Sequence, residues 1–165
     1  MKNNTCCFTG HRFIAKDDVD PIKALLRKEI ARQAEKGRTV FCAGGALGFD
    51  TLAAECVLEA KKKHPAIKLL LFLPHKGQAS SWREAEKRRY AEILAAADGV
   101  SYACDEYVDG CMFTRNRQLC DASSVCIAFL EHGSGGTFYT VKYARTHGLE
   151  IVNIAKRLRG LENEN

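Results

Sequence analysis

Three glycine-bearing segments of the sequence have the residue types that hold phosphate. They are Phe8-Thr9-Gly10-His11-Arg12, Gly44-Gly45-Ala46-Leu47-Gly48-Phe49-Asp50 and Gly133-Ser134-Gly135-Gly136-Thr137. Glycine lets the backbone approach a ligand closely, a threonine hydroxyl can bond a phosphate oxygen, and arginine offers a planar fork that matches phosphate. The second and third segments each stand between an expected strand and an expected helix, where free backbone N–H groups and the helix dipole favour an anion. The sequence therefore predicts a site for a phosphate-bearing ligand.

None of these segments reproduces a standard nucleotide-binding motif. The second lacks the G-x-G-x-x-G order of the dinucleotide fingerprint and the Lys-Ser/Thr of a P-loop. The first, taken alone, fits a tight turn with a solvated Arg12 equally well. Asp50 fits a helix cap better than a catalytic group. The sequence therefore indicates phosphate binding without naming the base, the sugar or the number of phosphates.

Residues outside these loops extend the candidate site. On a helix Arg115 and Asn116 diverge by about 100°, so only one of Arg115 and Arg117 needs to face the ligand, and we favour Arg115. Trp82 could stack on a base, although a tryptophan in the first turn of a helix packs a loop onto the core at least as often. The candidate ligand-binding residues are Thr9, Gly10, His11, Arg12, Gly44, Gly45, Ala46, Gly48, Asp50, Trp82, Arg115, Asn116, Gly135, Gly136 and Thr137.

The elements that must position these residues alternate between strand and helix along the whole chain. Strands are expected at 5–9, 39–43, 67–73, 99–103, 125–130 and 151–154, and helices at about 20–36, 51–63, 81–97, 112–120 and 137–147. This alternation predicts an α/β fold: a single Rossmann-like three-layer domain over residues 1–165, with a mostly parallel sheet of about six strands flanked by helices. In such a sheet the ligand lies outside the carboxyl ends of the strands, where the strand order reverses.

Two local expectations accompany this assignment. Ser81 is a credible N-cap for the third helix, with Glu84 three positions later to complete a capping box. Residues 156–165 are rich in charge and are expected to form a frayed tail.

Composition narrows the classes of function. The 165 residues carry a net charge of +5, which suits an anionic ligand but falls short of the footprint of a dedicated nucleic-acid binder. The eight cysteines form no C-x-x-C pair and no cluster at zinc spacing, which favours reduced structural thiols over a metal site. Because the longest apolar run is too short to cross a bilayer and the first residues lack a signal-peptide core, we expect a cytoplasmic protein with no membrane partner.

The order of motifs resembles the YpsA-like family. The residues that carry the resemblance are 8–12, 44–55, Pro74 with Gln78 and Trp82, Arg115-Asn116 with Asp121, and Gly135-Gly136-Thr137, so it runs from about residue 5 to residue 154. That family belongs to a wider superfamily, SLOG, that includes the DNA-processing protein DprA and the LOG phosphoribohydrolases. The resemblance implies a Rossmann-like fold that binds or senses a nucleotide or nucleotide-derived ligand, with no further cofactor required.

One departure from the LOG pattern bears on catalysis. LOG enzymes carry a P-G-G-x-G-T-x-x-E motif whose glutamate, with an upstream arginine, serves hydrolysis of the N-glycosidic bond. Gly136-Thr137 match the G-T and Arg115 matches the arginine, but the glutamate position is Thr140, which cannot support a cationic sugar transition state. The resemblance therefore implies binding in preference to phosphoribohydrolase activity. If the chain is an enzyme, Arg115 and Glu55 are the catalytic candidates, with Glu131 as another carboxylate that could substitute.

Two further implications come from the relatives. The likeness to DprA centres on residues 44–54, where that family binds single-stranded DNA alongside additional domains, and single-stranded DNA binding is kept as a lesser alternative. Binding of that kind normally needs stacking aromatics along a basic groove, and the sequence offers few. A homodimer is expected by analogy with related folds, because two-fold dimers are the commonest assembly.

Overall fold

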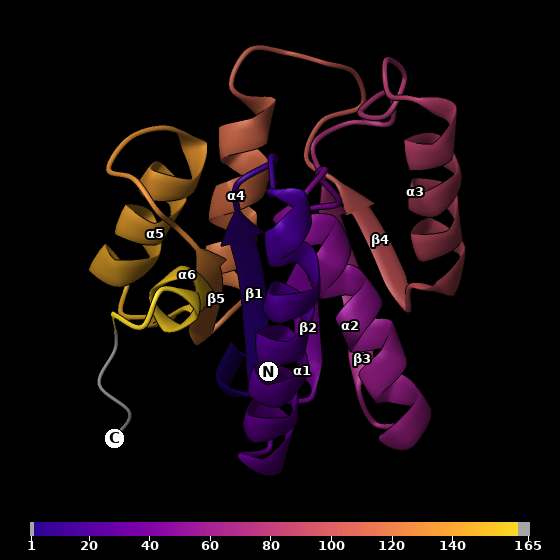
Figure 1. Ribbon diagram of the computed structural model, residues 1–165. Helices are drawn as coiled ribbons and strands as arrows, with labels where there is room; N and C mark the ends of the chain where they lie inside the picture. Colours follow the sequence, from indigo (N-terminus) through magenta and orange to yellow (C-terminus); the bar gives the residue numbers. More distant parts are fainter. Residues whose placement is uncertain (1, 162–165) are drawn as a thin grey trace.

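Within residues 2–161, which are those that the computed structural model describes, six strands form one parallel sheet (Figure 1). They are β1 (Thr5–Gly10), β2 (Val40–Ala43), β3 (Lys68–Leu73), β4 (Gly99–Tyr102), β5 (Val125–Phe129) and β6 (Glu150–Asn153), in the spatial order β4-β3-β2-β1-β5-β6. Each neighbouring pair is parallel. The predicted α/β class with about six strands is confirmed.

Helices cover both faces of this sheet. They are α1 (Val19–Glu35), α2 (Phe49–Lys63), α3 (Glu84–Ala96), α4 (Cys111–Asp121), α5 (Gly136–Thr146) and α6 (Ile154–Leu158), with short 3-10 turns at Lys2–Asn4 and Lys16–Asp18. On one face α1 packs against α2 and α6, and α3 packs beside α2. On the other face α4 packs against α5 (Figure 1). None of the helices in the described part combines the length and the apolar character of a membrane span.

Alternation along the strands divides the core into two parts. Phe8 and Ile127 pack with the residues of α1, α2 and α6, whereas Cys7, Cys42 and Cys126 pack with those of α4 and α5. Successive side chains of a strand point to opposite faces, so a strand covered on both sides must be apolar throughout. This explains why β5 is apolar throughout, why the middle of β1 is apolar, and why these three cysteines are small buried core residues.

The strand order reverses between β1 and β5. The chain moves from β1 through β2 and β3 to β4 on one side, and then crosses back to place β5 on the other side of β1. Thr9 pairs with Ala128 and Gly10 with Phe129, so the two strands end level with each other. The connections that leave them run to opposite faces and open a gap at the carboxyl edge. The first and third glycine-bearing segments therefore emerge side by side.

The start of α3 differs from the sequence prediction. The N-cap is Arg83, whose backbone N–H donates to Glu86 Oε1 at 3.0 Å, so the capping box predicted for Ser81 and Glu84 is wrong. Trp82 N donates to Ala79 O at 3.1 Å, which places Ser81 inside a turn before the helix. The capping box therefore lies two residues later in the sequence than predicted, because the predicted first residues of the helix form this turn instead.

The carboxyl-terminal segment also differs from the prediction. Residues 156–158, predicted within a frayed tail, belong to α6, and Asn153 caps this helix by accepting from Ala155 N at 3.1 Å. Arg157 Nη1 donates to the buried Glu29 at 2.8 Å, since a buried carboxylate requires a charged partner. Arg159 bridges Asp18 and Glu131, each at 2.7 Å. Residues 162–165 of the predicted tail lie outside the described residues.

Substitution of Gly10 tests the packing at the ends of β1 and β5, where the strand order reverses. A β-carbon at this position would overlap the ring of Phe49, which is fully buried and stacks on Phe129 with centroids 5.8 Å apart. Gly10→Ala should therefore lower the free energy of unfolding by about 1–3 kcal/mol, measured by urea denaturation. Gly133→Ala is the matched control, because a β-carbon there would have no neighbour within 4 Å. Equal midpoints for the two variants would contradict this account.

Candidate functional site

A cavity of about 270 Å³, called the crevice below, lies at the carboxyl ends of β1 and β5. Its walls come from the end of β1 and the loop after it, the loop after β2 with the first turn of α2, the amino-terminal half of α4, and the loop before α5 with the first turn of that helix. The lining residues are Phe8, Thr9, Gly10, His11, Arg12, Ala46, Asp50, Met112, Phe113, Arg115, Asn116, His132, Ser134, Gly135, Gly136 and Thr137. The structure thus brings together eleven of the fifteen candidate residues, in the place that the strand order predicts.

The crevice contains groups suited to an anion. Gly135 is the N-cap of α5 with φ 91°, a left-handed conformation that favours glycine, and Gly136 and Thr137 of the first turn line the cavity. The first turn of a helix leaves backbone N–H groups without intrahelical acceptors. Arg12 reaches from the end of β1 towards α4, where its Nη2 lies 3.8 Å from Met112 Sδ. A helix amino terminus and a guanidinium therefore face one small cavity.

Arg115 forms the floor of the crevice and is only 4% exposed. Its Nη1 donates to Gly44 O, and its Nε donates to Asn116 Oδ1 at 2.7 Å. A β-carbon on Gly44 would lie 2.5 Å from Arg115 Nη1, so glycine is required there to admit the guanidinium. Burial lowers the pKa of Arg115, and the neighbouring Asp50 opposes that shift. Arg115 therefore serves both to fix the loop after β2 and to place positive charge beneath the crevice.

Asp50 is a buried carboxylate with one unpaired oxygen. Its Oδ2 accepts from Ala46 N at 3.3 Å, while Oδ1 has no hydrogen-bond partner among the described residues. Burial raises the pKa of Asp50 to about 6, against the opposing effects of Arg115, the Ala46 N–H and Arg12. The helix-cap interpretation of this residue is wrong. Gly48 is the N-cap of α2, and Asp50 lies within the first turn, where its side chain turns back to Ala46.

Two histidines join the loops that follow β1 and β5. The rings of His11 and His132 stack with centroids 4.2 Å apart and an interplanar angle of 14°. His11 Nε2 accepts a hydrogen bond from Glu131 N at 3.0 Å. Burial, followed by the nearby His132, lowers the pKa of His11, and Glu131 opposes this. His11 is therefore held as a neutral acceptor, which is the state that this hydrogen bond requires.

Four of the candidate residues lie outside the crevice. Gly48 is close to the His11 and Arg12 carbonyl groups, and Gly45 is close to Leu73 and Tyr90, so both serve contacts between chain segments, as Gly44 does. Trp82 packs edge-on against Tyr90, with centroids 5.1 Å apart and an interplanar angle of 74°. The Trp82 ring therefore packs the loop after β3 onto the core. Of the two roles considered for Trp82, loop packing and base stacking, this contact fits loop packing.

The carboxylates considered for catalysis are also elsewhere. Glu55 Oε2 accepts from Arg89 Nε at 2.7 Å between α2 and α3, and Glu131 Oε1 accepts from Arg159. Thr140 is buried and its hydroxyl donates to Gly136 O at 2.9 Å within α5. Among residues 2–161, Asp50 is the one carboxylate that lines the crevice.

Five lining residues were not among the candidates: Phe8, Met112, Phe113, His132 and Ser134. Phe8 and Ser134 lie inside the first and third glycine-bearing segments and His132 directly precedes the third, so their position at the strand ends was the signal that could have found them. Met112 and Phe113 lie on α4 one turn before Arg115 and Asn116, so helical spacing was the corresponding signal.

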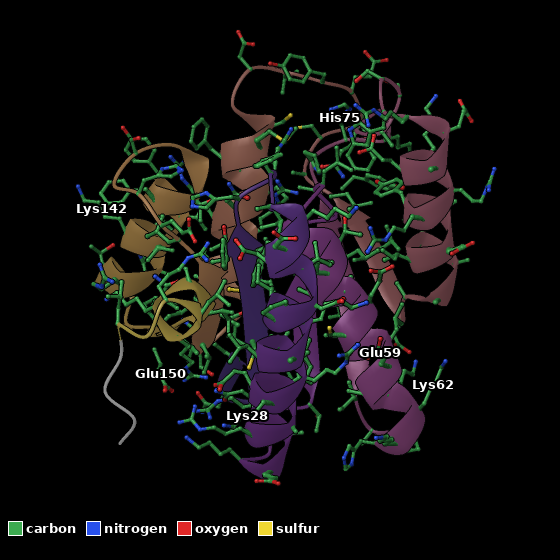
Figure 2. The ribbon with its side chains drawn as sticks, in the orientation of Figure 1. Lys28, Glu59, Lys62, His75, Lys142 and Glu150 are labelled. Atoms are coloured by element: carbon green, nitrogen blue, oxygen red, sulfur yellow. The ribbon has the colours of Figure 1, made fainter. Side chains whose placement is uncertain are left out.

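Charged side chains on the opposite end of the molecule are separate from this site. Figure 2 shows Lys28, Glu59 and Lys62 towards that end of α1 and α2, whereas His75 lies at the carboxyl edge of the sheet, just after β3. The carboxyl edge is thus the part of the fold where the glycine-bearing loops gather.

A protein-family model named YpsA, described as the YspA SLOG family, matches residues 7–154. The chain belongs to this family. The predicted resemblance is therefore confirmed over nearly its whole extent. The YpsA-family match begins inside β1 and ends at the first residue of α6, so it covers five whole strands, most of β1 and all the lining residues of the crevice.

Several bacterial relatives of this YpsA-family domain are similar in sequence. A UPF0398 protein of Halalkalibacterium halodurans is 39% identical over 79 residues, which are 48% of this chain and 42% of that protein. The SPbeta prophage-derived protein YoqJ of Bacillus subtilis is 30% identical over 76% of this chain and 79% of its own. A UPF0398 protein of Bacillus thuringiensis is 32% identical over 82% of this chain and 74% of its own. The first of these matches thus spans less than half of the relative's length.

Solved structures of DprA have a similar fold. The single-stranded-DNA-binding DNA processing protein A of Helicobacter pylori has a TM-score of 0.63 at 19% identity, over 96% of this chain and 74% of that chain. DprA of Streptococcus pneumoniae has a TM-score of 0.54 at 14% identity, over 99% of this chain and 63% of that chain. At these identities the likeness shows that the YpsA-family domain shares the DprA-like fold.

The raised pKa of Asp50 predicts a pH-dependent stability for the YpsA-family domain. Because the folded chain holds this proton more tightly than the unfolded chain, the contribution of Asp50 to stability is largest below about pH 4 and falls as the pH rises to about 6. Asp50→Asn removes this dependence of stability on pH, because an amide does not ionise. The free energy of unfolding of D50N relative to wild type should therefore rise by roughly 2–3 kcal/mol between pH 4 and pH 7.

Urea denaturation at intervals of one pH unit measures this difference. Asp105→Asn, at an exposed carboxylate in the loop after β4, is the matched control and should follow the wild-type curve. Parallel curves for D50N and wild type across this range would show that Asp50 ionises in the folded chain as it does in the unfolded one.

Proposed function

We propose that the crevice binds the phosphate group of a nucleotide or nucleotide-derived ligand, and that the chain binds or senses this ligand without turning it over. The observation that carries this proposal is the convergence of Arg12, Arg115 and the amino terminus of α5 on one cavity at the strand reversal. Guanidinium groups and free helix N–H groups both favour phosphate. Thr9 and Thr137 add hydroxyl groups on the same lining.

Asp50 supports a ligand that carries hydrogen-bond donors as well as phosphate. Its Oδ1 is buried and unpaired among the described residues, and a buried acceptor without a partner costs free energy. A hydroxyl of a ribose is a donor of suitable size. Phosphate bound near Arg12 and sugar hydroxyls near Asp50 would together satisfy both the cations and the unpaired oxygen.

The positions of the other carboxylates support binding in preference to turnover. Thr140 stands where LOG enzymes have their glutamate, and its hydroxyl is occupied by Gly136 O. Glu55 and Glu131 are ion-paired outside the crevice. Neither is therefore in place to support a cationic sugar at the lining of the cavity.

Calorimetric titration with ribose 5-phosphate, nucleoside monophosphates and ADP-ribose tests this proposal. We expect saturable binding, and Arg12→Ala should weaken it by about 10- to 100-fold, because a charge-assisted hydrogen bond contributes about 1.5–3 kcal/mol. Arg88→Ala is the matched control, since Arg88 is exposed on α3. Folded protein that binds none of these compounds would overturn the proposal.

One observation favours a second candidate function, hydrolysis of the N-glycosidic bond of a nucleoside monophosphate. A carboxyl group with a pKa of about 6 can donate a proton near neutral pH, and Asp50 is such a group at the crevice lining. Asp50 would protonate the leaving base while water adds to the sugar carbon, and the proton from that water would return to Asp50.

Chromatography of nucleoside monophosphates incubated with the protein tests for this reaction. The second candidate requires release of free base and ribose 5-phosphate by wild type and at least a 100-fold slower release by D50N, because general acid catalysis contributes about 10²–10⁴-fold. No release at high protein concentration would reject it and leave the binding proposal standing.

Single-stranded DNA remains the lesser alternative. The DprA of Helicobacter pylori that shares this fold binds single-stranded DNA, but the sequences are 19% identical. Oligonucleotide binding through several phosphates would weaken steeply with added salt, whereas one phosphate in the crevice would give a shallow dependence.

A further inference from the structure

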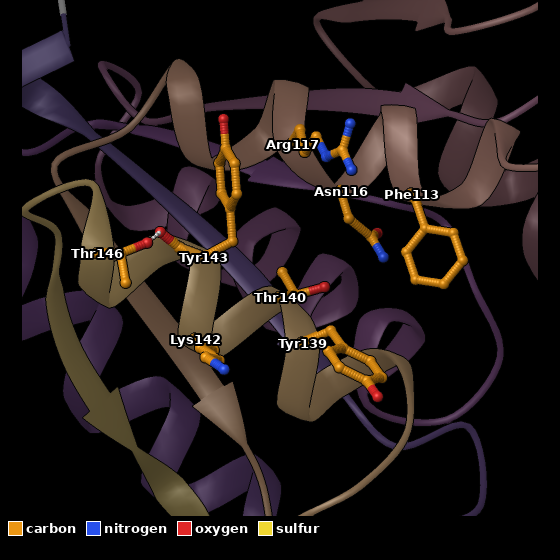
Figure 3. Close-up of a pocket in the computed structure, with 8 residues that line it drawn as sticks. All are labelled: Phe113, Asn116, Arg117, Tyr139, Thr140, Lys142, Tyr143 and Thr146. Atoms are coloured by element: carbon orange, nitrogen blue, oxygen red, sulfur yellow. Dashed lines mark hydrogen bonds between the residues drawn. The ribbon is translucent and has the colours of Figure 1, made fainter.

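A second and larger cavity, of about 530 Å³, lies between α4 and α5 (Figure 3). This α4–α5 groove is lined by Phe113, Asn116 and Arg117 of α4, and by Tyr139, Thr140, Lys142, Tyr143 and Thr146 of α5. It is an open surface groove, in which Phe113 is 49% exposed and Tyr139 is 56% exposed. Two large aromatic side chains are therefore left in contact with solvent on its walls.

The groove adjoins the crevice. Phe113 and Asn116 line both cavities, so they form a shared wall. On α5 the boundary falls within a single turn, because Gly136 and Thr137 line the crevice while Tyr139 and Thr140 line the groove. A ligand whose phosphate lies at the amino terminus of α5 has its remaining atoms within reach of the groove.

The crevice alone is small for a whole nucleotide. Its volume of about 270 Å³ lies just below the usual range of about 300–1,000 Å³ for small-molecule sites. A sugar phosphate fits this space better than a complete nucleotide does. The adjoining groove supplies the additional volume on the side where Phe113 and Tyr139 lie.

We propose that the α4–α5 groove is the base subsite of the nucleotide site. This inference rests on the proposed function: the phosphate and sugar occupy the crevice, and the aromatic base lies in the groove against Phe113 and Tyr139. Aromatic side chains stack on bases with a gain of about 1–3 kcal/mol per base. The exposed rings of Phe113 and Tyr139 provide such surfaces beside the sugar phosphate.

Asn116 supplies polar recognition of the base. Its Oδ1 accepts from Arg115 Nε at 2.7 Å, and since arginine can only donate, the amide oxygen must face Arg115. The amide nitrogen of Asn116 therefore points to the other side, and Figure 3 shows this side chain reaching into the space beside Phe113 and Tyr139. A base with a ring nitrogen or carbonyl oxygen on its edge would accept this hydrogen bond.

The charge of the groove agrees with a nucleotide occupant. Arg117 and Lys142 are on the lining, and no acidic side chain of residues 2–161 is on it. Asp121, which is nearby, accepts a hydrogen bond from the hydroxyl of Tyr143 at 2.7 Å. The groove thus combines aromatic surfaces, an amide donor and positive charge, which suits an electron-rich base joined to an anionic phosphate.

Paired titrations test the groove separately from the crevice. Ribose 5-phosphate reports on the crevice alone, and the four common nucleoside 5′-monophosphates report on both cavities. We expect at least one monophosphate to bind 5- to 100-fold more tightly than ribose 5-phosphate. Phe113→Ala and Tyr139→Ala should each weaken binding of that monophosphate at least 5-fold. Tyr139 lines the groove and not the crevice, so Tyr139→Ala should leave the affinity for ribose 5-phosphate within 2-fold of wild type.

Conservative variants separate stacking from a change in stability. Tyr139→Phe keeps the ring and should retain the affinity, whereas Phe113→Leu keeps apolar volume without an aromatic face and should lose it. Tyr107→Ala, at an exposed ring in the loop before α4, is the matched control and should bind as wild type does. Melting temperatures near that of wild type confirm that each variant is folded.

Three results would overturn the base subsite. If ribose 5-phosphate binds and the F113A and Y139A variants bind every monophosphate as wild type does, the groove is not involved and the proposed function stands. If no probe binds, ribose 5-phosphate included, the proposed function fails together with this inference. If light scattering shows that F113A or Y139A separates an oligomer into single chains, the groove is a contact between copies.

Discussion

The site depends on one buried interaction, in which Arg115 of α4 donates to the carbonyl oxygen of Gly44 at the end of β2. Helix α4 covers one face of the sheet, while the loop that begins at Gly44 leads to α2 on the other face. The guanidinium therefore joins the two helical layers across the carboxyl edge. It requires a residue without a side chain at position 44, and it sets a positive charge beside the buried Asp50. The contacts of Arg115 with Gly44 and Asp50 therefore determine the floor of the crevice.

This interaction also explains the charge balance of the crevice. Glu29, Glu55 and Glu131 are each ion-paired with an arginine elsewhere in the fold. Asp50 differs because burial raises its pKa to about 6, so it is mostly ionised at pH 7 and loses its negative charge as the pH falls below about 6. The lining carries two guanidinium groups and a helix amino terminus against this one carboxylate. Positive groups therefore outnumber negative ones on the described lining of the cavity.

Much of the fold could be predicted from sequence because its signals are local. Strands buried on both faces are mostly apolar, and the loops at their ends are rich in glycine, so these patterns located the strands near residues 5–9, 39–43 and 125–130 and the loops that follow them. The capping-box error at the start of α3 had a local cause, but two other errors arose where a distant partner decides the outcome. Arg157 is ordered by Glu29, which is 128 positions away, and Asp50 faces Arg115 instead of capping α2. Spacing also could not show that Gly44 and Gly48 make room for other parts of the chain, because that role depends on tertiary contacts.

The stacked imidazoles of His11 and His132 have a consequence for how a ligand would enter. They fasten the loops after β1 and β5 to each other, and the hydrogen bond from Glu131 N to His11 fixes their separation. Loops held in this way have lost most of their conformational entropy during folding, so little ordering remains for the moment of binding. A preorganised crevice selects its ligand by fit instead of by closing around it. Related ligands would then associate with such a rigid site at similar rates, and the differences in affinity between them would lie in their dissociation rates.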